Sequence, residues 1–251
     1  MHDLNYAALT AWANERVPDA AFWSVSGAHL YGFPSVDSDI DLRGSYFAPI
    51  PALIGLRIPS ETQEPKGWLG GVEVEAVAHE AGKYLRLMLK HNGYILEQVF
   101  SPLVVHGAEF LARLRPLAAR CVTRGCYYHY RGFLHTQRKQ IDGQNGVKAK
   151  ALLYAYRVVL TGIHLLRTGE VESHLPTLNA SFRLGFIPEL IERKTHAEFG
   201  TLADLDAVLH TAELDRLEAE LDRAFAESTL PEAGPVDEVN RFLVAERVAR
   251  S

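Results

Sequence analysis

The spacing of apolar residues changes its period along the chain. Apolar side chains recur at helical spacing from Leu4 to Ala13, and Pro18 ends the helix that this pattern predicts. Short apolar or alternating runs then predict three strands, at 22–26, 40–47 and 72–77. The segment 49–69 is rich in Pro and Gly, so we expect it to be irregular.

From Glu80 onward the period becomes helical again. Helices are predicted beyond Phe110 over four ranges, namely 110–130 with a break allowed at Gly125, 130–141, 148–167 and 202–226. The turn-forming run 142–146 is expected to be a loop. These patterns predict an α/β (α+β) first domain at 1–110 and a mostly helical second domain at 111–251.

Composition excludes several classes of protein. The 251 residues are 47% apolar, which is enough for a full core. No run of eighteen or more apolar residues occurs, and the N-terminus lacks a secretory pattern, so we predict a cytoplasmic protein with no membrane partner. Cys121 and Cys126 have no second pair of ligands with zinc spacing and are expected to be reduced thiols.

The net charge of −5 hides a strongly uneven distribution. Between Leu111 and Thr168 there are eleven Lys or Arg residues and a single acid, Asp142. A strip of positive charge in an acidic protein would attract phosphates. The sequence therefore predicts RNA as a partner of the 111–168 segment.

A run of polar residues after the second predicted element carries the candidate chemistry. Gly27 would let the backbone approach a phosphate, and Ser35 and Ser38 offer hydroxyls nearby. Asp39 and Asp41 are two residues apart on one strand, so both carboxylates point to the same side and suit hard cations. An Asp-x-Asp alone is common on solvated strands, but its conjunction with the glycine turn favours a functional site.

A third carboxylate would complete this site. In the alternating strand 72–77, Glu73 and Glu75 share one face. If Glu75 comes from a neighbouring strand, it would join Asp39 and Asp41 in a two-metal site that stabilises both the entering and the leaving oxygen of a phosphoryl transfer. Glu75 is favoured over Glu73, but the strand register leaves both open.

These motifs resemble the DNA polymerase β-like nucleotidyltransferase superfamily, in which a Gly-Ser turn precedes Asp-x-Asp and a later acid. One branch, the predicted nucleotidyltransferases associated with RNA repair, is similar over further segments, at 29–33, 39–44, 83–87, 92–97 and 150–157. The resemblance implies a mixed-sheet catalytic domain, a helical C-terminal part, two Mg²⁺ or Mn²⁺ ions and a nucleoside triphosphate such as ATP. It also implicates Lys83, which is otherwise an ordinary helix residue.

One departure concerns the turn itself. This chain has Ala28 where the superfamily usually has Ser, so one hydroxyl contact to the triphosphate is missing unless Ser26 or Ser38 replaces it. The third acid is also a Glu rather than the more common Asp.

Two further groups of residues have both a structural and a functional interpretation. Lys150 and Arg157 lie on one stripe of the helix predicted at 148–167, where they either face solvent or meet a triphosphate or RNA phosphate. The aromatic residues between 127 and 133 are interleaved with cations, which suits stacking on single-stranded bases, although packing between helices is the more common use.

The function predicted from these features is transfer of a nucleoside monophosphate from a nucleoside triphosphate to a hydroxyl, with an RNA 3′ end as the favoured acceptor. The catalytic and metal-binding residues would be Asp39, Asp41 and Glu75. The nucleotide-binding residues would be Ser26, Gly27, Ser35, Ser38, Lys83, Lys150 and Arg157. The alternatives are a protein or small-molecule acceptor, or a degenerate nucleotide-binding or antitoxin-like module.

Overall fold

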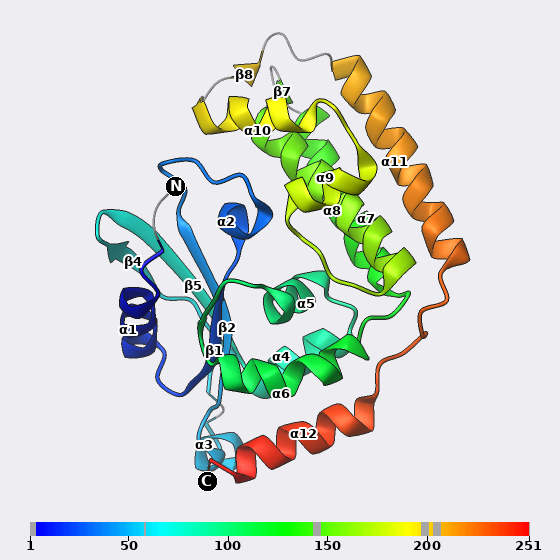
Figure 1. Cartoon of the computed structure of the whole chain (residues 1–251). Helices are drawn as coiled ribbons and strands as arrows, with labels where there is room; N and C mark the ends of the chain where they lie inside the picture. Colours follow the sequence, from blue (N-terminus) through cyan, green and yellow to red (C-terminus); the bar gives the residue numbers. More distant parts are fainter. Residues whose placement is uncertain (1–3, 58, 143–146, 197–200, 203–206, 251) are drawn as a thin grey trace. The chain divides into compact units, whose positions relative to one another are not determined.

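A computed structural model of the chain describes residues 4–57, 59–142, 147–196, 201–202 and 207–250, which form two compact units (Figure 1). The sheet unit comprises His2–Leu30, Asp37–Cys121 and Ala233–Ser251. The helical unit comprises Tyr31–Val36 and Val122–Glu232. The short segment 31–36 thus belongs to the helical unit, although in sequence it lies between the glycine turn and the two aspartates.

The sheet unit is built on a mixed sheet. Its strands are β1 (Ala20–Val25), β2 (Ile40–Tyr46), β3 (Thr62–Gln63), β4 (Lys66–Leu69), β5 (Val72–Glu80) and β6 (Val104–His106). Their order across the sheet is β3, β5, β2, β1, β6, and β4 also pairs with β5. The pair of β2 and β5 is parallel, whereas the other pairs are antiparallel. The predicted mixed sheet is therefore confirmed.

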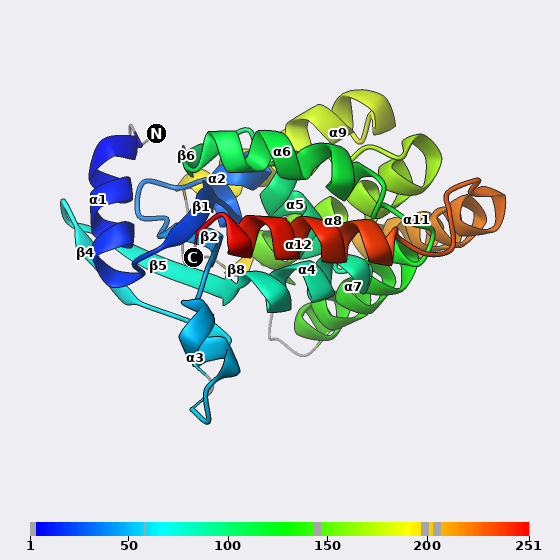
Figure 2. The same ribbon diagram turned by 90° about the horizontal axis from the view of Figure 1, so that it is seen from below.

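Helices cover both faces of this sheet (Figure 2). The helices of this unit are α1 (Tyr6–Arg16), α3 (Ile50–Ile54), α4 (Ala81–Leu89), α5 (Gly93–Phe100), α6 (Ala108–Ala119) and α12 (Val236–Val248), and α2 (Gly27–Tyr31) follows β1. Those that pack against its strands include α1, α4, α5 and α6. On one face the Trp23 indole donates a hydrogen bond of 3.1 Å to Asn14 of α1. On the other, the Phe22 ring meets Tyr84 of α4 edge-on at 5.4 Å and stacks on Phe110 of α6 at 6.1 Å. Neighbouring residues of β1 thus fill separate cores.

The helical unit surrounds one apolar helix. Its elements are α7 (Cys126–Asp142), α8 (Ala149–Thr168), α9 (Leu175–Phe182), α10 (Ile187–His196) and α11 (Ala207–Glu227), with a strand pair of β7 (Val147–Lys148) and β8 (Thr201–Leu202). Helix α8 packs against α7, α9, α10 and α11. By length and composition α8 could cross a membrane, but 78% of its apolar window is buried within the protein, as in the core helix of a soluble protein. The predicted helical C-terminal part is confirmed.

Several predicted elements differ in detail from the structure. The helix expected over 110–130 is two helices, α6 and α7, that end and begin on either side of 120–125. The segment 49–69 is not wholly irregular, because it contains α3 and the strand β4, whose hairpin with β5 turns at Gly70 and Gly71. The loop expected at 142–146 lies largely outside the described residues.

The compact units also differ from the predicted ranges 1–110 and 111–251. Helix α12 belongs to the sheet unit, where its Phe242 ring lies 5.8 Å from the Phe110 ring. Figure 2 shows α12 between α6 and α4. Its Arg247 Nη2 donates to Glu80 Oε1 at 2.7 Å, and the other oxygen of this buried carboxylate accepts from the Gly82 amide at the start of α4. A functional division at residue 110 stays a prediction.

Replacing Arg247 by Met should destabilise the sheet unit, because Glu80 would remain buried without its cation. Breaking a fully buried pair costs about 3–5 kcal/mol, and Arg247 is partly exposed, so we expect about 2–3 kcal/mol. Urea denaturation followed by circular dichroism measures this loss.

The matched control is Arg86→Met. The ion pair of Arg86 with Glu61 is more than half exposed on both sides, so its loss should cost less than about 1 kcal/mol. Equal losses for the two variants would show that the contact of α12 with Glu80 does not stabilise the unit.

Candidate functional site

The parallel pairing of β2 and β5 brings the candidate carboxylates together. Asp41 lies directly opposite Glu75 in this pairing, and neighbouring strands lie about 4.8 Å apart. Along β2 the apolar residues Ile40 and Leu42 are buried, whereas Asp41 is only partly buried, as expected for alternating faces. Glu73, two residues before Glu75, is also partly buried on β5. The predicted sharing of one side by Asp41 and Glu75 thus matches the register.

Two cations hold these carboxylates. The Arg43 guanidinium donates through Nη2 to Asp41 Oδ1 at 2.7 Å and through Nη1 to the Leu42 carbonyl at 2.9 Å. Lys66, the first residue of β4, is opposite Glu75 in the antiparallel pairing of β4 with β5. Its Nζ lies 2.5 Å from Glu75 Oε1 and 2.9 Å from Glu73 Oε1. The acidic face is therefore partly neutralised by the chain itself.

Asp39, immediately before β2, remains exposed beside this cluster. Its carboxyl pKa is raised above the ordinary value by partial desolvation and by the negative charges of Glu73, Glu75 and Asp41, which Lys66 only partly offsets. A raised carboxyl pKa means that the ionised form of Asp39 is less stable here than in water, first because of desolvation and then because of the neighbouring acids. A positive charge close to Asp39 would offset the second of these two effects.

The Asp41 carboxylate lies directly against Gly27. A Cβ built on Gly27 would fall 2.0 Å from Asp41 Oδ2, and Gly27 has a φ of +62°, in the left-handed region that favours glycine. The amide of the preceding residue, Ser26, donates to the Asp41 carbonyl at 2.8 Å. Only glycine therefore lets the turn after β1 close over this aspartate.

The donor set suits a hard cation in its chemistry, since it consists of carboxylate oxygens. Within the described ranges, however, no three His, Cys, Asp or Glu side chains are arranged so that they could hold a metal ion. Asp41 and Glu75 instead hold Arg43 and Lys66. A bound cation at this face would have to share or replace these partners.

The other predicted nucleotide-binding residues are divided between the two units. Ser35 is buried in the helical unit, where its Oγ accepts a hydrogen bond of 2.7 Å from the buried Lys194 of α10. Lys83 of α4 donates a hydrogen bond to Thr62 of β3. Thr62 pairs with His79 near the C-terminal end of β5, four residues beyond Glu75. No feature of the sequence distinguished Lys194, because it lies on a polar helix like any surface lysine.

Arg157 does not face solvent, in contrast to one of the two interpretations of its stripe. It is fully buried in the helical unit, and its guanidinium lies 4.1 Å from the centre of the Tyr31 ring. The burial of His129 and the charge of Arg157 together lower the pKa of that histidine to about 4. Lys150, two stripe positions earlier, is exposed. Arg157 thus contacts the 31–36 segment inside the unit, whereas Lys150 is open to ligands.

The basic segment 111–168 does not carry the free charge that its composition indicated. Six of its arginines form ion pairs with acids of the C-terminal helices and their connection: Arg113 with Glu246, Arg120 with Glu238, Arg124 with Glu232, Arg131 with Glu218, Arg138 with Asp215, and Arg167 with Glu220. More than half of the positive charge that the sequence predicted for this segment is therefore offset by acids from other parts of the chain. Lys139 and Lys150 are exposed members of the segment.

The aromatic residues between 127 and 133 pack largely against helices. The Tyr127 ring stacks on Phe225 of α11 at 4.3 Å, and Tyr130 is fully buried. Tyr128 remains 67% exposed. Most of this group therefore serves the core of the helical unit, which was the favoured structural interpretation.

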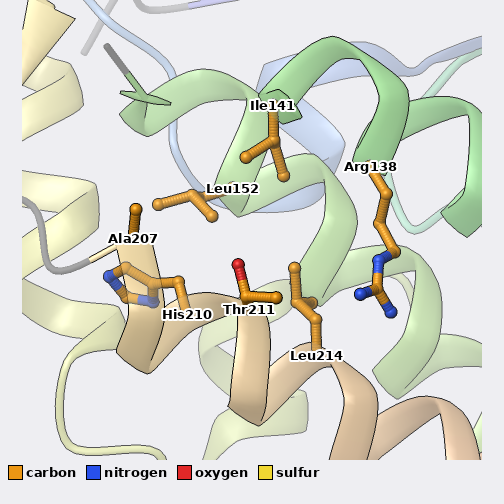
Figure 3. A pocket seen from close by; sticks show the side chains of 7 residues that line it. All are labelled: Arg138, Ile141, Leu152, Ala207, His210, Thr211 and Leu214. Atoms are coloured by element: carbon orange, nitrogen blue, oxygen red, sulfur yellow. The ribbon is translucent and has the colours of Figure 1, made fainter. Parts of the chain in front are cut away.

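A small cavity lies between α7, α8 and α11 in the helical unit (Figure 3). Its lining includes Arg138, Leu152 and His210, and Thr211 points toward its centre. His210 Nδ1 lies 2.8 Å from the buried Tyr156 hydroxyl. The cavity volume is about 10 Å³, which holds at most one water molecule, so it is no substrate site.

A comparison with known protein families identifies the family of this chain. The chain matches the RNA repair pathway DNA polymerase beta family over residues 1–245. It belongs to this family. Members are nucleotidyltransferases of the polymerase β type, so the family resemblance drawn from the sequence motifs is confirmed.

Individual similar proteins give less information about this chain than the family match does. An uncharacterized protein of Methanocaldococcus jannaschii is 30% identical over 153 residues, which cover 61% of this chain and 62% of that protein. The match therefore spans less than two thirds of the relative's length. A nucleotidyltransferase-like protein from Exiguobacterium sibiricum is 12% identical, with a TM-score of 0.34 over 88% of this chain and 74% of that one.

Substituting Gly27 by Ala should displace the Asp41 carboxylate. The new methyl group would overlap Oδ2, so either the turn or the aspartate must move. We expect a loss of at least about 3 kcal/mol in stability, combining overlap with left-handed strain. Urea denaturation and the carboxyl carbon chemical shift of Asp41 measure the two effects.

Gly70→Ala provides the control, because Gly70 has a similar φ of +58° and no atom within 4 Å of the added Cβ. It should show only the strain of about 1–2 kcal/mol and leave Asp41 unchanged. If both variants lose the same stability and the Asp41 signal stays in place, Gly27 does not shape the site.

Proposed function

We propose that the protein transfers a nucleoside monophosphate from a nucleoside triphosphate to a hydroxyl acceptor and releases pyrophosphate. The observation that supports this most is the register that pairs Asp41 with Glu75, next to Asp39 and beneath Gly27. Gly27, Asp41 and Glu75 are separated in sequence, and the pairing of β2 with β5 and the turn after β1 bring them to neighbouring positions. The close contact of Asp41 with Gly27 favours a functional site over acids that are merely solvated on the sheet surface.

The residue roles follow from this placement. Asp39 and Asp41 would hold two Mg²⁺ or Mn²⁺ ions, with Glu75 as a further ligand of one of them. When bound, the two cations stabilise charge on the entering and leaving oxygens. The acceptor hydroxyl oxygen bonds to the α-phosphorus, the bond from phosphorus to the β-phosphate oxygen breaks, and Glu75 accepts the hydroxyl proton. Gly27 gives the phosphates close access to the backbone, and Ser26 and Ser38 are the candidate hydroxyls.

An RNA 3′ end is the acceptor we favour, in a cytoplasmic enzyme. The support comes from the family, whose description places its members in an RNA repair pathway. The positive charge of the basic segment supports an RNA acceptor less than the composition indicated, because most of its arginines have acidic partners. Lys139 and Lys150, which are exposed, are candidates for contacts with RNA phosphates.

Replacing Asp39 or Asp41 by Asn should reduce nucleotidyl transfer by at least about a hundredfold, because each loss of about 1.4 kcal/mol in transition-state stabilisation lowers the rate tenfold. The fold should persist, since Asp39 is exposed and the amide oxygen introduced by Asp41→Asn could still accept from Arg43. Transfer is measured with labelled triphosphate at saturating Mg²⁺.

Asp37→Asn is the matched control, because Asp37 is exposed and only two residues before Asp39. It should retain wild-type turnover. The variants Glu75→Gln and Glu73→Gln then identify the third acid, and the larger loss is expected at Glu75. Wild-type turnover in Asp41→Asn would refute the assignment of the site.

The acceptor is tested by incubation with each labelled triphosphate, Mg²⁺ or Mn²⁺, and an RNA pool, followed by mass analysis of RNA and protein. If RNA is the acceptor, binding of single-stranded RNA should weaken with salt, with a log-log slope near about −0.7 per phosphate contacted. The double variant Lys139→Gln and Lys150→Gln removes two possible phosphate contacts and should make that slope less negative by about 1.4.

The control for this slope is Arg113→Gln with Arg120→Gln, which removes the same charge from residues already paired with Glu246 and Glu238. This double arginine variant should change the salt dependence of RNA binding less than the double lysine variant does. Label on the protein, or no measurable RNA affinity, would favour a protein or small-molecule acceptor instead.

A further inference from the structure

Lys66 occupies an unusual place beside the carboxylates. It is fixed there by the hairpin of β4 and β5, whose turn at Gly70 and Gly71 sets the register in which Lys66 faces Glu75. Cross-strand partners on one face interact directly, so this position is a consequence of the fold and not of a chance surface contact.

The ammonium bridges two acids that the proposed function places at or next to a metal ion. Its Nζ contacts Glu75 Oε1 at 2.5 Å and Glu73 Oε1 at 2.9 Å, and its charge also acts on Asp39. A lysine is a compact point charge on a flexible stem of four carbons, and this side chain is 57% exposed. It can therefore leave the cluster without unfolding of the strand.

We propose that Lys66 is a built-in counterion that holds Glu75 in the metal-free protein and is displaced when a divalent cation binds. This inference rests on the proposed function, since it takes Glu75 as a metal ligand. One ammonium and one divalent ion compete for the same carboxylate oxygen. Lys66 therefore weakens metal binding, and in return it suppresses repulsion among Asp39, Glu73 and Glu75 while no metal is present.

Replacing Lys66 by Met keeps most of the stem and removes the charge. Mn²⁺ affinity, measured by calorimetry and by electron paramagnetic resonance, should rise at least about fivefold, the factor that corresponds to the interaction of two unit charges about 4 Å apart in bulk water, because Lys66 is largely solvated. Without metal, the melting temperature of the variant should fall below that of the wild type. Saturating Mn²⁺ should raise it by more than it raises the wild type.

Three further variants isolate the cause. Lys90→Met removes one positive charge at the C-terminal end of α4 and should change Mn²⁺ affinity little. Lys66→Arg keeps the charge and should restore weak binding. In a Glu75→Gln background, Lys66→Met should lose most of its effect on Mn²⁺ affinity, because the shared oxygen no longer carries a full charge.

The outcomes separate this inference from the proposed function. If Asp41→Asn abolishes Mn²⁺ binding but Lys66→Met leaves it unchanged or weakens it, the metal site stands and the counterion role is refuted. If neither the wild type nor Lys66→Met binds Mn²⁺, or if Asp41→Asn binds it as the wild type does, the metal assignment fails together with the inference.

Discussion

The site depends on one pairing, the parallel contact of β2 with β5. Because side chains alternate along each strand, a shift of one residue would turn Glu75 away from Asp41 and toward the buried core. The apolar neighbours Leu42 and Ala76 oppose each other in the same register and are buried, so the core that stabilises the sheet also fixes which acids face one another. The position of the acids is thus set by hydrophobic packing.

The same pairing creates an electrostatic problem. Parallel neighbours with acids at matching positions repel each other, and Asp39 lies at the end of the same face. Two cations reduce this repulsion: Arg43 of β2 pairs with Asp41, and Lys66 of the hairpin of β4 and β5 pairs with Glu75. The two cations differ in exposure, because Lys66 is 57% exposed whereas Arg43 is 24% exposed and also donates to two backbone carbonyls. Lys66 is therefore the cation that another positive charge could displace more easily.

The sequence predicted the local features of this site well. Period-two alternation placed Asp41 and Arg43 on one face, and the motif around Gly27 predicted the strand and turn before them. The sequence could not predict Lys66, because the Pro and Gly residues of 49–69 obscured β4, and its partner Glu75 is fixed only by a tertiary register. Arg157 shows a second limit of the sequence. A charged residue on a polar stripe of a helix is expected to face solvent, but tertiary packing buries Arg157 against the Tyr31 ring.

The basic segment illustrates why composition is a weak guide to binding surfaces. Its arginines are close in sequence to one another, but their acidic partners lie some 50 to 130 residues further along, in α11, α12 and the connection between them. Charge that is uneven along the chain becomes even in space, because the acidic helices fold back onto the basic ones within each unit. Under the proposed function, the exposed Lys139 and Lys150 are therefore the residues of this segment to test first for contacts with RNA phosphates, because the six paired arginines already have acidic partners.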